Sequence, residues 1–270
     1  MKGKTLIFTV NKVQRQLYEL LVQKGADCVS AESIDKSKAK EFLKEFDNIV
    51  LPFPSSEESI SKVIGGKVLS DVLSENQVVI GGLIYDDLRS EIIKANAKQL
   101  DYFENEAYVL KNAFITSQGA LKVLLDTTDD FVVGKKVLVT GFGKIGKSIS
   151  VILKNLGMKV FVAVRSDKAR VEALSMGFDV LSFNQLSGAI FYFDFIFNTV
   201  PERVFENRDI KHMRDDAFYF ELASKPFGAD KTYFDEYDKN YISANGLPGK
   251  YYPAAVAENI YNFICSFGGE

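Results

Sequence analysis

Residues that commonly bind metals are scarce in this chain. Its 270 residues include one histidine, two cysteines and no tryptophan. His212, Cys28 and Cys265 lie far apart and form no C-x-x-C pair, so the sequence indicates no metal centre. We interpret both cysteines as reduced thiols that pack like small apolar side chains, as in cytoplasmic proteins.

Long runs of one kind of residue are also lacking. The 33 basic and 36 acidic residues give a net charge of -3. They include no cluster of basic residues of the kind that binds the phosphate backbone of a nucleic acid. The longest apolar run, AIFYFDFIF, is interrupted by Asp194 and is shorter than the roughly 20 residues that span a bilayer. The first ten residues, MKGKTLIFTV, have no signal-peptide core. We therefore expect a cytoplasmic protein with neither nucleic acid nor a membrane as partner.

Short apolar stretches alternate with amphipathic ones along the whole chain, which predicts an α/β fold of two doubly wound lobes. We assign residues 1–114 to an amino-terminal substrate or partner lobe, and residues 115–252 to a Rossmann dinucleotide-binding domain. A long helix from about Thr116 is expected to join the lobes. A terminal helix in 253–270 is expected to return to the first lobe. Strands are expected at 5–10, 48–54, 77–82, 136–140, 159–164, 179–182, 193–199, 217–222 and 241–244.

The stretch VLVTGFGKIGKSIS (137–150) contains three glycines spaced as G-x-G-x-x-G. The pattern follows an apolar strand and opens a helix within a strand-helix-strand unit of about 30 residues, the setting that dinucleotide binding requires. The first glycine allows a tight turn, the second admits a pyrophosphate, and the third lets the helix pack on the strand. Glycines that serve packing alone are the alternative. The predicted pyrophosphate site comprises Gly141, Phe142, Gly143, Lys144, Ile145 and Gly146.

The end of the next strand indicates which dinucleotide binds. An NAD site usually has an acid there that accepts the ribose 2′-hydroxyl, whereas this chain has Arg165 and Ser166 in VAVRSD. An arginine can instead pair with a 2′-phosphate, so we predict NADP as the cofactor. Lys144 and Lys168 are either further phosphate contacts or plain surface charges. Asp167 is the one nearby acid that could instead favour NAD over NADP.

Polar or glycine-bearing segments follow three later strands, where ligands of doubly wound sheets bind. We expect them to line the nicotinamide half of the cofactor; ordinary sharp turns are the alternative. The residues concerned are Asn198, Thr199, Val200 and Pro201, then Leu222 and Ala223, then Gly246, Leu247 and Pro248.

Several stretches together resemble the family formed by the A subunit of dipicolinate synthase. They are YFENEAYVLKNAFITSQGA, TGFGKIG, VRS, FNTVP, LASKPFG and GLPGKYYPAAVAENI, with VLPFPSS in the first lobe. The resemblance implies NADP-dependent oxidation of a dihydrodipicolinate-type ring, derived from a lysine-pathway precursor in spore-forming bacteria. It also implies that the partner is the flavoprotein-like B subunit of that enzyme, and a homo-oligomer is compatible with it.

A small cyclic dicarboxylate substrate requires cations and hydrogen-bond donors in the site. We predict Lys225 and Arg15 as carboxylate anchors, with Asn112, Thr116 and Ser117 as polar donors. Each has an alternative as a surface cation or helix cap, and Thr116 in particular could cap the connecting helix. His212 lies in the polar stretch IKHMRDD, and we expect no catalytic role for it.

The chain departs from the family on the substrate side. The family's G-G-D-x-R segment is here VNKVQRQ, which keeps only Arg15; Gln118 and Lys225 replace an acid and an arginine. Alternatives therefore stay open: a non-catalytic or regulatory paralogue that binds NADP(H), or an NAD(P)-dependent oxidoreductase acting on a 2-hydroxy acid or an imine.

Overall fold

The computed structural model describes residues 3–35, 37–65 and 69–267, which form two compact units. The first unit comprises Met1–Asn112 and Pro248–Glu270, and the second comprises Ala113–Leu247. The boundaries drawn from the sequence lay slightly later, at 114/115 and 252/253. Residues 268–270 of the predicted terminal segment lie outside the described residues.

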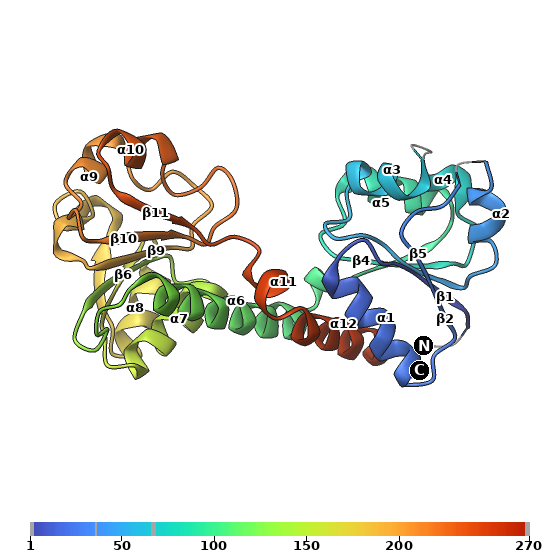
Figure 1. Cartoon of the computed structure of the whole chain (residues 1–270), viewed down its shortest axis with the longest axis horizontal. Coiled ribbons are helices and arrows are strands. Elements are labelled where there is room, and N and C mark those ends of the chain that lie inside the picture. The colour runs from blue at the N-terminus through green and yellow to red at the C-terminus, as the bar shows by residue number, and fades with distance from the viewer. Residues whose placement is uncertain (1–2, 36, 66–68, 268–270) are drawn as a thin grey trace. The chain divides into compact units, whose positions relative to one another are not determined.

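The first unit contains a parallel sheet with the strand order β2-β1-β3-β4-β5 (Figure 1). Its strands are β1 (Thr5–Phe8), β2 (Cys28–Ala31), β3 (Asn48–Val50), β4 (Val78–Gly81) and β5 (Lys98–Asp101). Its helices are α1 (Lys12–Gln23), α2 (Ala39–Leu43), α3 (Glu57–Ile64), α4 (Leu69–Val72), α5 (Asp86–Lys94), the 3-10 turn η1 (Tyr102–Glu104) and α12 (Pro253–Phe267).

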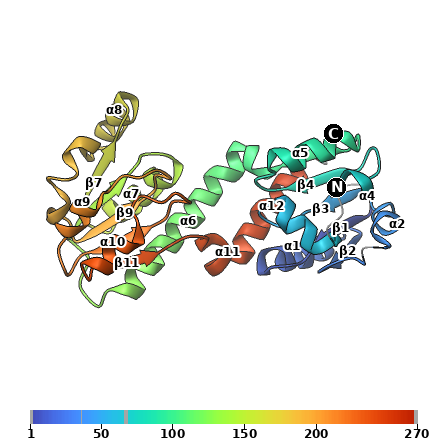
Figure 2. The same cartoon turned by 90° about the horizontal axis from the view of Figure 1, so that it is seen from above.

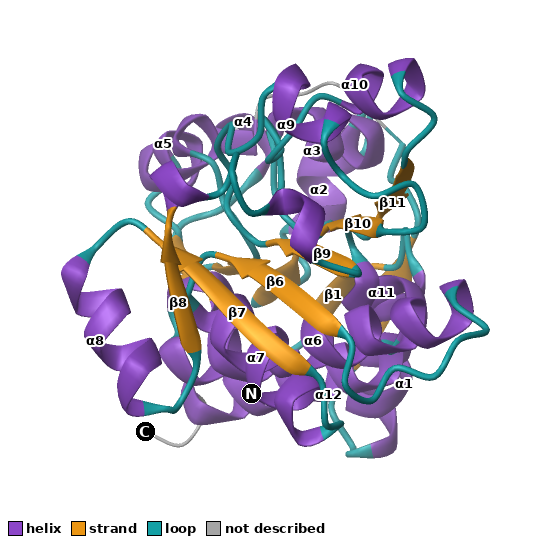
Figure 3. Ribbon diagram, turned by 90° about the vertical axis from the view of Figure 1, so that its left-hand side faces the viewer, coloured by secondary structure: helices purple, strands orange, loops and turns teal. Residues whose placement is uncertain are grey.

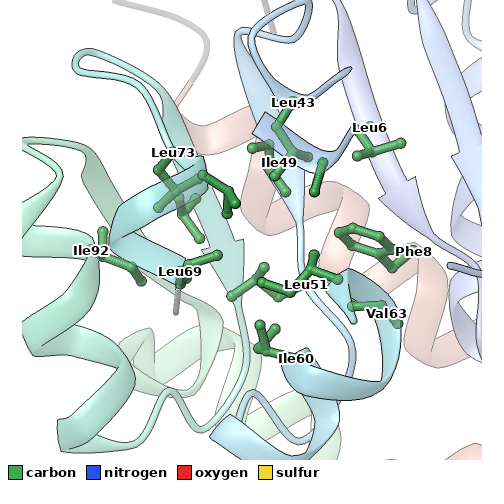
Figure 4. Packing of buried hydrophobic residues seen from close by; sticks show 14 of the residues in the cluster. Leu6, Phe8, Leu43, Ile49, Leu51, Ile60, Val63, Leu69, Leu73 and Ile92 are labelled. Carbon is green, nitrogen blue, oxygen red and sulfur yellow. The ribbon is translucent and has the colours of Figure 1, made fainter. Parts of the chain in front are cut away.

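Alternating strand residues of the first unit supply its main core. Leu6 and Phe8 of β1 lie with Ile49 and Leu51 from β3 and its following loop, against apolar side chains of α2, α3, α4 and α5 (Figure 4). The terminal helix α12 lies beside α1, and the Asn259 Nδ2 atom donates to the Tyr108 carbonyl at 3.0 Å (Figure 2). The expected return of the terminal helix to the first lobe is therefore confirmed.

The second unit contains a parallel sheet with the order β11-β10-β9-β6-β7-β8, in which β6 lies between β7 and β9 (Figure 3). This is the Rossmann order, so the predicted fold of the second lobe is confirmed. The strands are β6 (Lys136–Thr140), β7 (Lys159–Val164), β8 (Asp179–Ser182), β9 (Phe195–Asn198), β10 (Phe218–Glu221) and β11 (Asn240–Ser243). The helices are α7 (Lys144–Asn155), α8 (Asp167–Ser175), η2 (Phe183–Gln185), η3 (Ile190–Tyr192), α9 (Asn207–Lys211) and α10 (Lys231–Glu236).

Two helices contain the boundaries between the units: α6 (Glu106–Thr127) and α11 (Leu247–Tyr251). The expected start of the connecting helix near Thr116 is wrong. Asn105 Oδ1 accepts a hydrogen bond from the Tyr108 amide at 2.9 Å, which is an N-cap contact that starts the helix earlier. Thr116 consequently lies buried inside α6 and does not cap it.

Candidate nucleotide-binding site

The glycine loop joins β6 to α7 at the carboxyl edge of the second sheet. Gly141 has a φ of +88°, and a Cβ there would lie 2.7 Å from Thr199 Oγ1 and 2.8 Å from Val200 Cγ2. A Cβ on Gly146 would lie 2.3 Å from the Gly141 carbonyl oxygen. Both contacts are closer than van der Waals packing permits, so the turn and the helix approach require glycine at these two positions.

Gly143 is different, because nothing in the protein crowds it. It is exposed at the N-cap of α7 with a φ of -77°, and a Cβ there would meet no atom within 4 Å. The first-turn amides of α7 have no carbonyl partner within the helix, and that turn carries no acidic residue to oppose an anion. The open space beside Gly143 therefore fits a pyrophosphate at the helix start.

The neighbours of these glycines divide between core and surface. The Phe142 ring is buried and packs edge-on against Phe178, with ring centroids 5.7 Å apart. Only the backbone of Phe142 is thus available to a nucleotide. Lys144 is exposed at the first position of α7, and Ile145 is half-buried behind it.

Arg165 directly follows β7 and is half exposed. Its guanidinium lies 4.7 Å from the centre of the Phe183 ring and forms an ion pair with the Glu202 carboxylate. Ser166 caps α8, because its Oγ accepts from the Ala169 amide at 3.2 Å. β7 contains no acidic residue, and the next acid along the chain, Asp167, is exposed in the first turn of α8.

The side chains at the end of β9 join neighbouring strands. Thr140 Oγ1 donates to Asn198 Oδ1 at 2.5 Å, and Thr199 Oγ1 donates to the Thr140 carbonyl at 2.7 Å. Asn198 is fully buried and its Nδ2 donates to Glu221 and to the Val200 carbonyl. The Asn198 amide is therefore used within the protein. The half-buried Thr199 and Val200 and the exposed Pro201 are the residues of this segment with surface to offer a ligand.

Glu221, the last residue of β10, was missed in the sequence because it reads as one more strand residue in FYFELAS. Its carboxylate is fully buried and accepts four hydrogen bonds, from Asn198 Nδ2 (2.6 Å), Gly228 N (2.8 Å), Ala223 N (3.1 Å) and Tyr219 OH (3.1 Å). Burial raises the pKa of Glu221, and the hydrogen bonds oppose part of that rise. The carboxylate thus fixes the loop that follows β10 to the end of β9.

This role gives a pH-dependent stability prediction. In Glu221→Gln, an amide NH₂ group faces hydrogen-bond donors, and we expect a loss of about 1–3 kcal/mol in unfolding free energy. Because the folded-state pKa is raised, the wild-type carboxyl stabilises most below its unfolded pKa and loses that contribution as pH rises through the folded pKa. Urea unfolding, monitored by circular dichroism, gives the unfolding free energies of both proteins. The difference between wild type and variant should become smaller from pH 4.5 to pH 8. A gap that widens over this range would contradict the assignment.

The other predicted strand-end residues follow β10 and β11. Leu222 and Ala223 are buried, and the Ala223 carbonyl accepts from Asn245 Nδ2 at 2.5 Å. Lys225 is exposed in the same loop, before the cis peptide bond to Pro226. Gly246 has a φ of +65°, whereas Leu247 is buried against α6, where a Cβ on Gly119 would come within 2.8 Å of it. Pro248 belongs to the first unit.

The remaining predicted substrate residues lie in α6 and in the first unit. Ser117 is buried in α6, and its hydroxyl donates to the Ala113 carbonyl at 2.9 Å. Arg15 and Asn112 belong to the first unit, where Arg15 pairs with Glu32 at 2.9 Å and donates to the Thr9 carbonyl at 3.3 Å. Among the described residues, no three acidic, histidine or cysteine side chains converge as a metal site. None of the described helices has the length and apolar character needed to span a membrane.

Comparisons with known proteins agree with this geometry. The family model for the S-adenosyl-L-homocysteine hydrolase NAD binding domain matches residues 112–239. The A subunit of dipicolinate synthase from Bacillus subtilis (strain 168) is 25% identical over 237 residues, which cover 82% of this chain and 77% of that protein. The resemblance to this dipicolinate synthase protein is confirmed. Together these findings support a nicotinamide-dinucleotide-binding protein of the oxidoreductase type.

Solved structures add evidence on the fold. The A subunit of dipicolinate synthase from Bacillus halodurans superposes with a TM-score of 0.81 at 20% identity, covering 99% of this chain and 98% of that one. D-lactate dehydrogenase from Escherichia coli superposes with a TM-score of 0.63 at 11% identity, covering 98% and 97%. The fold of two doubly wound units is therefore shared with the dipicolinate synthase protein and, with a lower TM-score, with this D-lactate dehydrogenase.

Proposed function

We propose that this chain is the NADP-dependent A subunit of a dipicolinate synthase, acting in the cytoplasm. In the proposed reaction a dihydrodipicolinate-type ring passes a hydride from carbon to NADP and releases a proton, giving the aromatic dicarboxylate. The observation that carries the proposal is the glycine turn with open space at Gly143, set in a chain that resembles the dipicolinate synthase protein over most of its length.

The cofactor side of the proposal assigns roles to the second unit. The backbone of Gly141–Gly146 and the start of α7 would hold the pyrophosphate, with Lys144 beside it. Arg165 and Ser166 would contact the 2′-phosphate, which is why we propose NADP over NAD. Val200 and Pro201 would lie along the nicotinamide half of the cofactor. Asn198, which donates hydrogen bonds to the Val200 carbonyl and to Glu221, would hold this segment in place. Bound NADP supplies the hydride acceptor.

The substrate side depends on positioning more than on a strong base, because aromatisation of the ring already favours product. Lys225, exposed in the loop after β10, is our proposed anchor for one ring carboxylate. Arg15, in the first unit, stays a predicted carboxylate anchor, although Glu32 already pairs with it. Asn112 and Thr116 stay proposed donors. Ser117 is better assigned to packing, since its hydroxyl is used inside α6.

The experiment that tests the proposal is a turnover assay. The purified chain, the flavoprotein-like partner of a dipicolinate synthase, NADP and freshly prepared dihydrodipicolinate are mixed, and the reduced-nicotinamide absorbance is followed. We expect absorbance to rise together with dipicolinate, identified by chromatography, and expect Lys225→Ala to slow the reaction with NADP binding unchanged. Absence of product despite demonstrated NADP binding would reject the proposed reaction in favour of a non-catalytic NADP-binding protein.

A 2-hydroxy-acid dehydrogenase is the second candidate, because that class shares the fold. The sequence has one histidine to serve as its acid-base group, and His212 is exposed at the end of α9, with Nδ1 2.7 Å from the Arg208 carbonyl. This position is away from the strand ends where the cofactor is proposed to bind. We therefore favour ring oxidation over 2-hydroxy-acid oxidation.

A further inference from the structure

An ion pair joins the two strands that flank the glycine loop. Arg165 follows β7 and Glu202 follows β9, and both strands are direct neighbours of β6. The Glu202 carboxylate contacts the Arg165 guanidinium, while the Phe183 ring lies 4.7 Å from the same guanidinium. Both charged side chains are at least half exposed, so a ligand at this edge can reach them.

The Glu202 carboxylate affects how readily the Arg165 guanidinium can bind a phosphate. A carboxylate and a phosphate bind a guanidinium through the same fork of N–H donors, so they compete for it. A 2′-phosphate carries up to two negative charges and would be repelled by a carboxylate that stayed in place. A 2′-hydroxyl, in contrast, can donate a hydrogen bond to that carboxylate. Glu202 thus brings, from β9, the acceptor that β7 itself lacks at its end.

We propose that Glu202 is a specificity-determining residue, whose carboxylate holds Arg165, releases it when a 2′-phosphate binds, and accepts the 2′-hydroxyl when NAD binds. The inference rests on the proposed NADP site and deepens it. Its consequence is that the native chain binds both dinucleotides, with a preference for NADP smaller than Arg165 alone would produce.

The test is calorimetric titration of the full chain with NADPH and with NADH. Because the exposed pair is weak and the repulsion is partly screened, Glu202→Gln should bind NADPH about fivefold to tenfold more tightly. NADH should bind more weakly, because the charged acceptor of the 2′-hydroxyl is lost. Asp235→Asn, which removes the same charge from an exposed position on α10, is the control and should change neither affinity. Equal gains for NADPH and NADH in Glu202→Gln, or no change in either, would overturn the proposal.

The same substitution in an Arg165→Gln protein distinguishes competition for the Arg165 guanidinium from direct repulsion between the Glu202 carboxylate and the 2′-phosphate. In Arg165→Gln there is no guanidinium to release, so the further change Glu202→Gln should improve NADPH binding by much less than in the wild type. The same improvement in both backgrounds would contradict the mechanism. Failure of the wild type to bind NADPH at all would instead reject the proposed cofactor, so the two hypotheses fail in different ways.

Discussion

Gly143→Ala is expected to abolish most NADP binding while leaving the fold intact. A Cβ at this position meets no protein atom within 4 Å, and its φ of -77° suits alanine, so thermal unfolding without nucleotide should be unchanged. The added methyl group would occupy the space through which the backbone approaches the pyrophosphate. We expect at least a tenfold loss of NADPH affinity, equivalent to about 1.4 kcal/mol or more.

Gly146→Ala provides the matched comparison in the same loop. Its Cβ would lie 2.3 Å from the Gly141 carbonyl oxygen, a backbone atom that cannot move aside without shifting the turn. Overpacking of this kind costs about 1–3 kcal/mol, which outweighs the gain in helix propensity of about 1 kcal/mol. We therefore expect a lower unfolding temperature together with lost NADPH binding. If Gly143→Ala bound NADPH like the wild type, the assignment of the pyrophosphate to this loop would be wrong.

Arg165→Gln should weaken NADPH far more than NADH. Hydrogen bonds to a charged group contribute about 1.5–3 kcal/mol, so the loss for NADPH should be about 10- to 150-fold before the effect of Glu202 is considered. NADH, which has no 2′-phosphate, should lose little. Arg170→Gln removes the same charge from an exposed position on α8 and should leave both affinities unchanged. Equal losses of NADPH and NADH in Arg165→Gln would show that Arg165 does not contact the 2′-phosphate.

The sequence predicted the parts of the fold that local patterns encode. The buried strands β6, β7 and β9 are continuous apolar runs, and the glycine spacing located the turn between β6 and α7. The edge strands β2 and β5 escaped prediction because CVSA and KQLD are partly solvated and lack a clear apolar period. The start of α6 was misplaced because its N-cap, Asn105, lies in a polar stretch before the apolar face begins.

The sequence identified site residues whose role follows from their position in the chain, but not those whose role depends on distant partners. Arg165 could be named from its place after β7, but its partner Glu202 lies 37 positions later and comes close only through the strand order. Glu221 likewise gave no signal, because its role depends on a donor from the end of β9, Asn198, and on the folded loop that brings Gly228 back to it. Asn198 was rightly placed at the strand end, yet its buried hydrogen bonds make it a support for the site rather than a free ligand contact.

We propose that the second unit binds NADP through the glycine loop and Arg165. Calorimetric titration of the wild-type chain with NADPH and NADH tests it most directly. We expect one site per chain and an affinity for NADPH about tenfold higher than for NADH, since Glu202 offsets part of the contribution of Arg165. Tighter binding of NADH, or no binding of either dinucleotide, would contradict it.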